Sequence, residues 1–151
     1  MSDFDDLYQT TLLERSKSAR RRGVLTAPCA CAQGYNPLCG DEITFYARRE
    51  GGIVSALRYE GQGCAISQAS ASMAAEAAEG LSEADAACEL ERALAWIKGE
   101  DGTRPLLEDW EALGGVVKFP MRVKCATMPV RAALESLKAP DGAQSEVAED
   151  L

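Results

Sequence analysis

Two strand-like segments joined by a pair of glycines constrain the fold of this chain most strongly. The segments are ITFYARRE at residues 43–50 and IVSALRYE at residues 53–60, with Gly51 and Gly52 between them. Glycine adopts the left-handed backbone conformations that tight hairpin turns require, so a Gly-Gly pair between two such runs predicts a β-hairpin. The chain is therefore expected to contain an antiparallel sheet.

Helical patterns lie on both sides of this hairpin. Apolar residues at three-to-four spacing predict a first helix that runs to about residue 21. The alanine-rich run AISQASASMAAEAAEG at residues 65–80 predicts a second helix, and residues 83–98 predict a third. Because aromatic residues make up only 6% of the chain, its core must be built largely from aliphatic side chains and alanine.

Two prolines divide the last third of the chain. Pro120 can begin a helical turn that carries Cys125. Pro129 would cost about 3 kcal/mol inside a helix, so we expect a break near residues 127–128 and a last helix over residues 129–137. The polar segment that follows is expected to be frayed.

Size and charge limit the classes of function. A chain of 151 residues is long enough for one domain with a modest core. Its net charge of -8 and pI near 4.6 argue against a nucleic-acid partner, because phosphate binding needs a basic surface. No apolar stretch is long enough to span a membrane, and the acidic start is unlike a secretory signal, so we expect a cytoplasmic protein.

The chain contains six cysteines and no histidine, so metal or redox chemistry must use sulfur and carboxylate groups. Cys39 lies in NPLCGDEI, Cys64 in EGQGCAISQAS and Cys125 in FPMRVKCATM, and Asp41 follows Cys39 by two residues. In a reducing compartment such cysteines are more often ligands or nucleophiles than disulfide partners.

Each of these three cysteines lies in a setting that favours a thiolate. Cys64 opens a predicted helix, where free N–H groups stabilise negative charge. Cys39 lies in a loop together with Asp41, and Cys125 follows the cation of Lys124. Taken singly, each also has a structural interpretation, as a buried small side chain or part of a common turn.

Three thiolates and one carboxylate satisfy the four positions of a tetrahedral zinc site. The carboxylate is the hard and weakly held member of such a set, so the site can open at one corner. If Cys39 leaves the metal instead while Asp41 stays bound, a nucleophilic thiolate is released. Iron–sulfur clusters also prefer cysteine thiolates, so the ligand types alone leave both metals open. The spacing of a zinc deaminase motif does not occur in the chain.

At NPLCGDEI, GQGCAISQASASM and KFPMRVKCATM the chain resembles the SufU branch of the IscU/NifU-type iron–sulfur cluster assembly proteins. The resemblance covers nearly the whole chain. It implies a compact single α+β domain over residues 1–138, with a small antiparallel sheet flanked by helices and a metal site at one end. Residues 139–151 are then expected to form a polar, disordered tail.

The resemblance also implies roles for particular residues. Cys39, Asp41, Cys64 and Cys125 match the metal ligands of the family, and Cys39 matches the residue that accepts persulfide sulfur from the cysteine desulfurase SufS. Arg122 matches the arginine of an R-x-K-C motif, which implies a supporting role near the site. An iron–sulfur assembly scaffold or an apo-acceptor protein would receive the sulfur, and neither nucleic acid nor a membrane is an expected partner.

Two features favour the SufU branch over the IscU scaffold branch. Lys124 stands where the scaffold branch has histidine, and residues 99–120 match an extra stretch typical of SufU. Cys29 and Cys31 are additional to the three family sulfurs; they are expected to be small loop residues, with a second thiol pair or a sulfur relay as the alternative. Cys88 is expected to lie in the core.

Three hypotheses follow. The first is a zinc-dependent sulfur acceptor, a sulfurtransferase that takes persulfide sulfur onto Cys39. The second is an IscU-like scaffold on which an iron–sulfur cluster is assembled and transferred. The third is a purely structural zinc domain, which the exchangeable carboxylate of Asp41 argues against, because structural zinc sites are usually closed sets.

Overall fold

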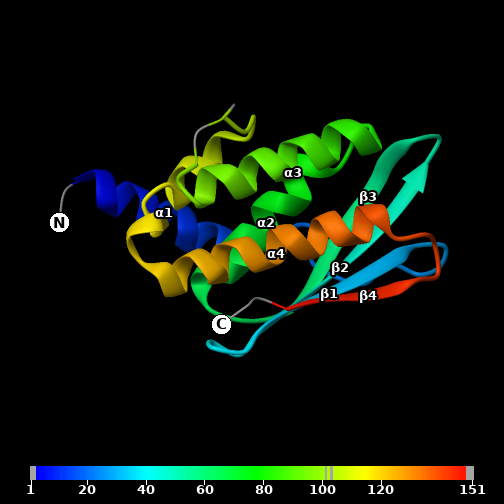
Figure 1. Ribbon diagram of the computed structural model, residues 1–151, viewed down its shortest axis with the longest axis horizontal. Helices are drawn as coiled ribbons and strands as arrows, with labels where there is room; N and C mark the ends of the chain where they lie inside the picture. The colour runs from blue at the N-terminus through cyan, green and yellow to red at the C-terminus, as the bar shows by residue number, and fades with distance from the viewer. Residues whose placement is uncertain (1–2, 101, 103, 149–151) are drawn as a thin grey trace.

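A four-stranded sheet is the centre of the computed structural model, which describes residues 3–100, 102 and 104–148 (Figure 1). The strands, in the sheet order β3-β2-β1-β4, are β3 (Ile53–Gln62), β2 (Asp41–Glu50), β1 (Ala30–Asn36) and β4 (Gln144–Ala148). The first three pair antiparallel, whereas β4 runs parallel to β1. The predicted hairpin is confirmed, with Gly51 and Gly52 in left-handed conformations at φ 59° and 80°.

Helices cover one face of this sheet. In chain order they are α1 (Asp3–Lys17), α2 (Ala65–Ala78), α3 (Glu83–Ile97), the short 3-10 helices η1 (Glu108–Leu113) and η2 (Val116–Lys118), and α4 (Pro120–Lys138). α4 lies along β1 and β2 and also contacts α2 and α3, as Figure 1 shows. Within the described ranges, no helix is both long enough and apolar enough to cross a bilayer. The expected α+β class is confirmed, with a mixed rather than a purely antiparallel sheet.

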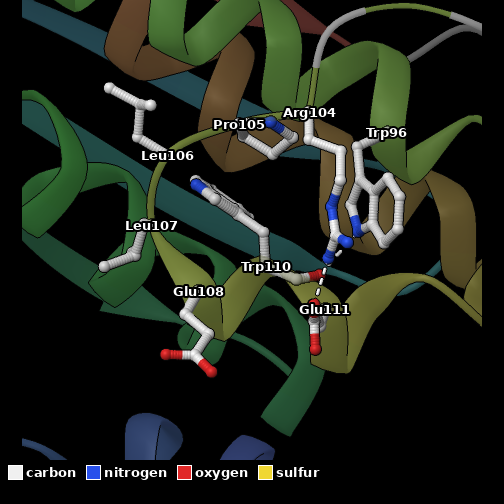
Figure 2. Close-up of a pocket in the computed structure, with 8 residues that line it drawn as sticks. All are labelled: Trp96, Arg104, Pro105, Leu106, Leu107, Glu108, Trp110 and Glu111. Carbon is white, nitrogen blue, oxygen red and sulfur yellow. Dashed lines mark hydrogen bonds and ion pairs between the residues drawn. The ribbon is translucent and has the colours of Figure 1, made fainter.

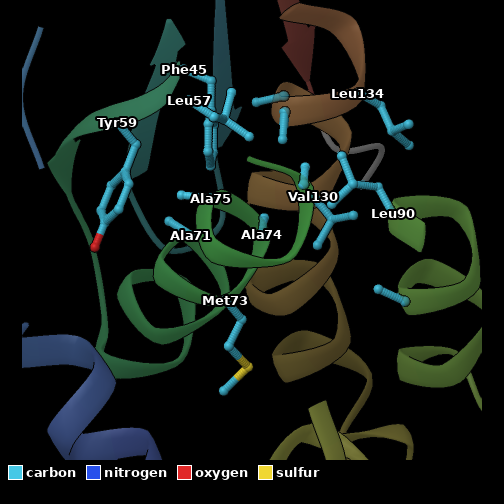
Figure 3. Packing of buried hydrophobic residues seen from close by; sticks show 14 of the residues in the cluster. Phe45, Leu57, Tyr59, Ala71, Met73, Ala74, Ala75, Leu90, Val130 and Leu134 are labelled. Atoms are coloured by element: carbon cyan, nitrogen blue, oxygen red, sulfur yellow. The ribbon is translucent and has the colours of Figure 1, made fainter. Parts of the chain in front are cut away.

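The core lies between the sheet and the helices (Figure 3). Alternate residues of β2, including Ile43 and Phe45, point into it, as expected for a strand with one buried face. On α2 the buried side chains are mostly small, and Ala71, Ala74 and Ala75 are fully buried. Small side chains let α2 approach its neighbours closely, so the predicted alanine-rich core is confirmed.

The first helix is shorter than predicted. α1 ends at Lys17 rather than near residue 21, because the chain turns and Arg21 adopts a left-handed φ of 62°. The turn brings Arg21 to an ion pair with Glu79 at 2.9 Å and places the Arg22 guanidinium 5.2 Å from the centre of the Tyr59 ring. Arg21 and Arg22 therefore pack against β3 and the end of α2 instead of extending α1.

The predicted break at Pro129 is wrong, because α4 runs without interruption from Pro120 to Lys138. Pro129 lacks an N–H, so the Cys125 carbonyl loses its usual helical partner. Burial of this part of α4 against the sheet and α2 compensates for the loss. In addition, the Ser70 hydroxyl on α2 donates to the Ala126 carbonyl at 2.6 Å, which supports the backbone beside the proline.

The tail also differs from expectation, since residues 144–148 form β4 instead of a disordered segment. Hydrogen bonds guide it onto the sheet: the Gly142 N–H donates to the Cys29 carbonyl at 2.9 Å, and the Cys31 N–H donates to the Ala143 carbonyl at 3.1 Å. β4 is stabilised because it pairs with the otherwise open edge of β1. The polar sequence of the tail does not reveal this pairing. Residues 149–151 lie outside the described part of the chain.

Close packing of α4 on β1 generates a test of the fold. A side chain at Gly34 would place its Cβ 2.5 Å from the Met128 sulfur and 3.1 Å from the Ala132 Cβ. Gly34→Val should therefore lower the free energy of unfolding by about 1–3 kcal/mol through overpacking, measured by urea denaturation. Gly115→Val, at an exposed glycine with nothing within 4 Å, is the matched control and should change stability little. Equal losses in the two variants would contradict this packing.

Candidate metal centre

A tight turn between β1 and β2 presents Cys39. Asn36 ends β1 directly opposite Asp41, the first residue of β2. The Asn36 carbonyl accepts hydrogen bonds from the Cys39 N–H at 3.3 Å and the Gly40 N–H at 2.8 Å, and Gly40 adopts a left-handed φ of 71°. The turn leaves Cys39 exposed, whereas Asp41 is fully buried.

The start of α2 faces the carboxylate of Asp41. Cys64 is the N-cap of α2, as its position after Gly-Gln-Gly predicts, and its sulfur accepts from the Ser67 N–H at 3.5 Å. The Cys64 N–H donates to Asp41 Oδ1 at 2.9 Å. A Cβ at Gly63 would collide with the Ser67 hydroxyl and would lie 2.8 Å from Asp41 Oδ1, so this close approach requires glycine.

Cys125 completes the site from the second turn of α4. Its side chain is fully buried, and its sulfur lies 3.4 Å from the Cys39 sulfur. Three donor atoms lie within 4.8 Å of one another, one each from Cys39, Asp41 and Cys125. The Cys64 sulfur lies 3.9 Å from Asp41 Oδ2. The structure thus brings all four sequence-predicted groups to the same end of the sheet, from the β1–β2 turn, β2, the start of α2 and α4.

Hydrogen bonding between sulfurs separates the acidities of two thiols. A hydrogen bond with the Cys125 thiol lowers the pKa of Cys64 to about 5. Burial acts in the opposite direction, and the hydrogen bond from the Ser67 N–H lowers this pKa further. The hydrogen bond between the two thiols, together with burial and a bond to Cys39, raises the pKa of Cys125. The sequence-based prediction that neighbouring cations favour a Cys125 thiolate is therefore wrong for the metal-free site. Lys124 is half-buried, and Arg122 is exposed on the first turn of α4.

The chemistry of this donor set fits a divalent cation. Several thiolates and a carboxylate packed together repel one another unless a positive ion lies among them. Asp41 is a carboxylate without exposure to water, and its second oxygen faces the Cys64 sulfur. Thiolate sulfur with one carboxylate oxygen is a set that zinc accepts, and iron–sulfur clusters also use thiolates.

Cys29 and Cys31 lie away from this centre. Cys31 is near the start of β1, five residues before Asn36, a separation of roughly 17 Å along an extended strand. Burial, with a smaller effect from neighbouring Cys29, raises the pKa of Cys31. The distance excludes direct sulfur relay between this pair and Cys39, and both side chains are partly exposed, as small loop and strand residues.

The prediction that Cys88 belongs to the core is wrong, because Cys88 is exposed. The buried face of α3 contains Ala86, Leu90 and Ala93, and Cys88 lies about 200° around the helix from Ala86. That buried face also includes Glu89, whose carboxylate accepts from the Leu106 and Leu107 N–H groups and anchors the segment after α3. Apolar periodicity alone does not reveal a buried glutamate.

Part of the segment expected from the resemblance, within residues 104–111, lines a different hollow. This hollow has a volume of about 320 Å³ and lies between the end of α3 and η1 (Figure 2). The Arg104 guanidinium lies 4.9 Å from the centre of the Trp96 ring, and the Trp96 N–H donates to the Trp110 carbonyl at 2.8 Å. No cysteine lines the hollow, so it is distinct from the candidate metal centre.

Sequence reasoning missed the residues that support the donors. Asn36 donates to the Cys125 sulfur at 3.7 Å, the Ser67 N–H donates to the Cys64 sulfur at 3.5 Å, and Gly63 allows Asp41 and α2 to meet. Asparagine before proline at the end of a strand is typical of a turn, and this signal could have indicated that Asn36 shapes the Cys39 loop. Its contact with Cys125 depends on the placement of α4, which no local pattern encodes.

Comparison with known proteins places the chain in a family. The model of the NifU-like N terminal domain matches residues 7–126. The zinc-dependent sulfurtransferase SufU of Bacillus subtilis is 34% identical over 143 residues, which cover 93% of this chain and 96% of that protein. The iron-sulfur cluster assembly scaffold protein IscU of Thermotoga maritima is 33% identical over 135 residues, 89% of this chain and 95% of that protein.

Solved structures agree. A crystal structure of a putative iron-sulfur cluster assembly scaffold protein for the SUF system from Fervidobacterium islandicum aligns with a TM-score of 0.79 and 29% identity, covering 84% of this chain and 93% of that one. A NifU-like protein (N-terminal) from Brucella abortus aligns with a TM-score of 0.76 and 28% identity, covering 91% and 96%. The chain therefore belongs to the family of NifU-like N-terminal domains, and the resemblance to SufU and IscU is confirmed.

The lowered pKa of Cys64 generates a test on the metal-free protein. Because this pKa is about 5 instead of 9, the thiolate should form as pH rises through about 5 and be fully present at neutral pH. Thiolate absorbance at 240 nm, recorded from pH 4 to 10, should show this early step. Cys64→Ser should abolish the step and Cys88→Ser, at an exposed position, should retain it. A protein without any thiolate below pH 7 would contradict the hydrogen-bonding arrangement.

Proposed function

We propose that this protein is a zinc-dependent sulfur acceptor in iron–sulfur cluster biogenesis, working as a sulfurtransferase with a SufS-type cysteine desulfurase. One observation carries the proposal: Cys39 lies on an exposed turn only 3.4 Å from the buried sulfur of Cys125. A sulfur that belongs to a metal site and is also accessible can meet a partner's active site without unfolding of the domain.

Four groups would hold the zinc ion: Cys39, Asp41, Cys64 and Cys125. When bound, zinc supplies positive charge that keeps closely packed thiols ionised near neutral pH. The protein contributes rigidity to three of these donors, since Asp41 and Cys125 are fully buried and Cys64 caps α2. It contributes mobility to the fourth, because Cys39 is carried on the four-residue turn between β1 and β2.

The transfer step conserves electrons. The Cys39 thiolate attacks the terminal sulfur of a persulfide on the desulfurase cysteine and forms a new S–S bond. The old S–S bond breaks, its electron pair leaves with the desulfurase cysteine as a thiolate, and Cys39 now carries the persulfide. No external oxidant or reductant is needed. The persulfide can then pass its sulfur to an assembly scaffold or an apo-acceptor protein.

Similarity to the Bacillus subtilis protein named zinc-dependent sulfurtransferase SufU supports the choice of zinc. Two features of the chain agree with that choice: Lys124 before Cys125, where the scaffold branch has histidine, and the segment at residues 99–120, which contains η1. Asp41 fits as well, because zinc accepts a carboxylate oxygen as the fourth ligand beside three thiolates.

A scaffold for iron–sulfur clusters is the second candidate function, favoured by the similarity to the Thermotoga maritima scaffold protein IscU. The same cysteines could hold a cluster, since clusters are bound by thiolates. Colour distinguishes the two functions. A sulfur acceptor should be purified colourless with about one zinc ion per chain. A scaffold should give a stable brown protein on anaerobic reconstitution and pass its cluster to an apo-acceptor.

Substitution at Cys39 tests the proposed function directly. Cys39→Ser should abolish stimulation of a SufS-type desulfurase, measured as alanine released from cysteine, because the accepting sulfur is removed. Cys88→Ser is the matched control, since Cys88 is also exposed but lies on α3, and should stimulate like the parent. Full stimulation by Cys39→Ser would overturn the proposed role of Cys39.

A further inference from the structure

Two sulfurs of the centre lie side by side in very different surroundings. Cys39 and Cys125 are separated by 3.4 Å, yet one is on an exposed turn and the other has no exposed surface. A site that opens at one corner needs a reason for one sulfur to leave while its neighbour stays. Burial limits access to Cys125, but burial alone does not fix the position of its sulfur.

The side chain of Asn36 supplies a second restraint. Its amide Nδ2 donates to the Cys125 sulfur at 3.7 Å, and its Oδ1 accepts from the Leu38 N–H at 3.2 Å. Asn36 is fully buried. The opposite orientation of the amide would set its N–H groups against the Leu38 N–H, donor against donor, so the two contacts define one orientation.

This contact completes a pattern in which three donors are each held by an N–H group. The Cys64 N–H holds Asp41, the Ser67 N–H holds the Cys64 sulfur, and the Asn36 amide holds the Cys125 sulfur. The Cys39 sulfur instead lies on the exposed turn, and its contact in the centre is with the Cys125 sulfur at 3.4 Å. The three donors that N–H groups hold therefore form the fixed part of the ligand set, and Cys39 is its movable ligand.

We propose that Asn36 is a positioning residue that anchors the Cys125 sulfur in the metal centre and thereby makes Cys39 the corner that opens. The inference rests on the proposed function. An N–H···S bond stabilises the negative charge of a thiolate and fixes its direction. Partners of this kind, outside the ligands themselves, typically change metal affinity 10–100-fold when removed. The Asn36 main chain closes the Cys39 turn, so one residue links the movable corner to the fixed one.

Two substitutions separate anchoring from a merely structural role in the turn. Asn36→Asp keeps an oxygen acceptor for the Leu38 N–H but replaces the donor beside Cys125 with a carboxylate oxygen. Asn36→Ala removes both contacts. If Asn36 served only to shape the turn, Asn36→Asp would retain zinc like the parent. If its N–H donor to the Cys125 sulfur is needed, both variants should retain zinc less well. Gln33→Glu is the matched control, because it makes the same amide-to-acid change on the opposite face of β1.

The experiment measures zinc release from the purified full chain to the chromophoric chelator 4-(2-pyridylazo)resorcinol. We expect Asn36→Asp to release zinc 10–100-fold faster than the parent, and Gln33→Glu to release it at the parent rate. A second readout is which of the three cysteines of the centre iodoacetamide alkylates first, located by mass spectrometry. Within the centre, alkylation should occur at Cys39 in the parent and at both Cys39 and Cys125 in Asn36→Asp, while the exposed Cys88 should react equally in both proteins.

Zinc release from Asn36→Asp at the parent rate, with Cys39 still the first cysteine of the centre to be alkylated, would overturn the inference. Should Asn36→Asp fail to fold, Asn36→Ser replaces it. The serine hydroxyl can serve the Leu38 N–H but is too short to reach the sulfur, so the same acceleration is expected. Parent protein without bound zinc would overturn the proposed function as well. Parent protein with zinc and an unchanged release rate in the variants would overturn the role of Asn36 alone.

Discussion

The hydrogen bond from the Cys64 N–H to Asp41 Oδ1, at 2.9 Å, is the interaction on which the candidate centre depends. It joins the first residue of β2 to the start of α2 and satisfies a carboxylate that has no exposure to water. Burying a charge is costly unless it is paired or hydrogen-bonded. The contact is possible because Gly63 has no side chain, which brings the backbone of α2 close to the carboxylate.

A second packing contact places the remaining sulfurs of the centre. α4 packs on β1 at Gly34, and this packing places Cys125 beside the turn that carries Cys39. The result is a site with buried donors and one accessible sulfur. Such a site suits an acceptor that must exchange a ligand with a partner. A closed structural zinc site would gain nothing from an exposed sulfur or from a carboxylate in place of a fourth thiolate.

Local features of the fold could be predicted from the sequence, and features that depend on long-range packing could not. The Gly51-Gly52 hairpin and the N-cap position of Cys64 are encoded by neighbouring residues, so both were predicted correctly. The continuity of α4 through Pro129, in contrast, depends on burial against the sheet and α2. The strand at residues 144–148 depends on the open edge of β1, and the contact of Asn36 with Cys125 depends on where α4 lies. The family resemblance suggested four candidate donors, which the structure brings close together, but the hydrogen bonds around them required the structure.

Zinc K-edge X-ray absorption on protein purified without added metal tests the central claim most directly, because it reports the atoms around the ion. We expect one zinc site with three sulfur neighbours at about 2.3 Å and one oxygen neighbour at about 2.0–2.2 Å. The oxygen should be replaced by sulfur in Asp41→Cys. A shell of four sulfurs in the parent, a shell of nitrogen and oxygen alone, or a protein free of zinc would contradict the account.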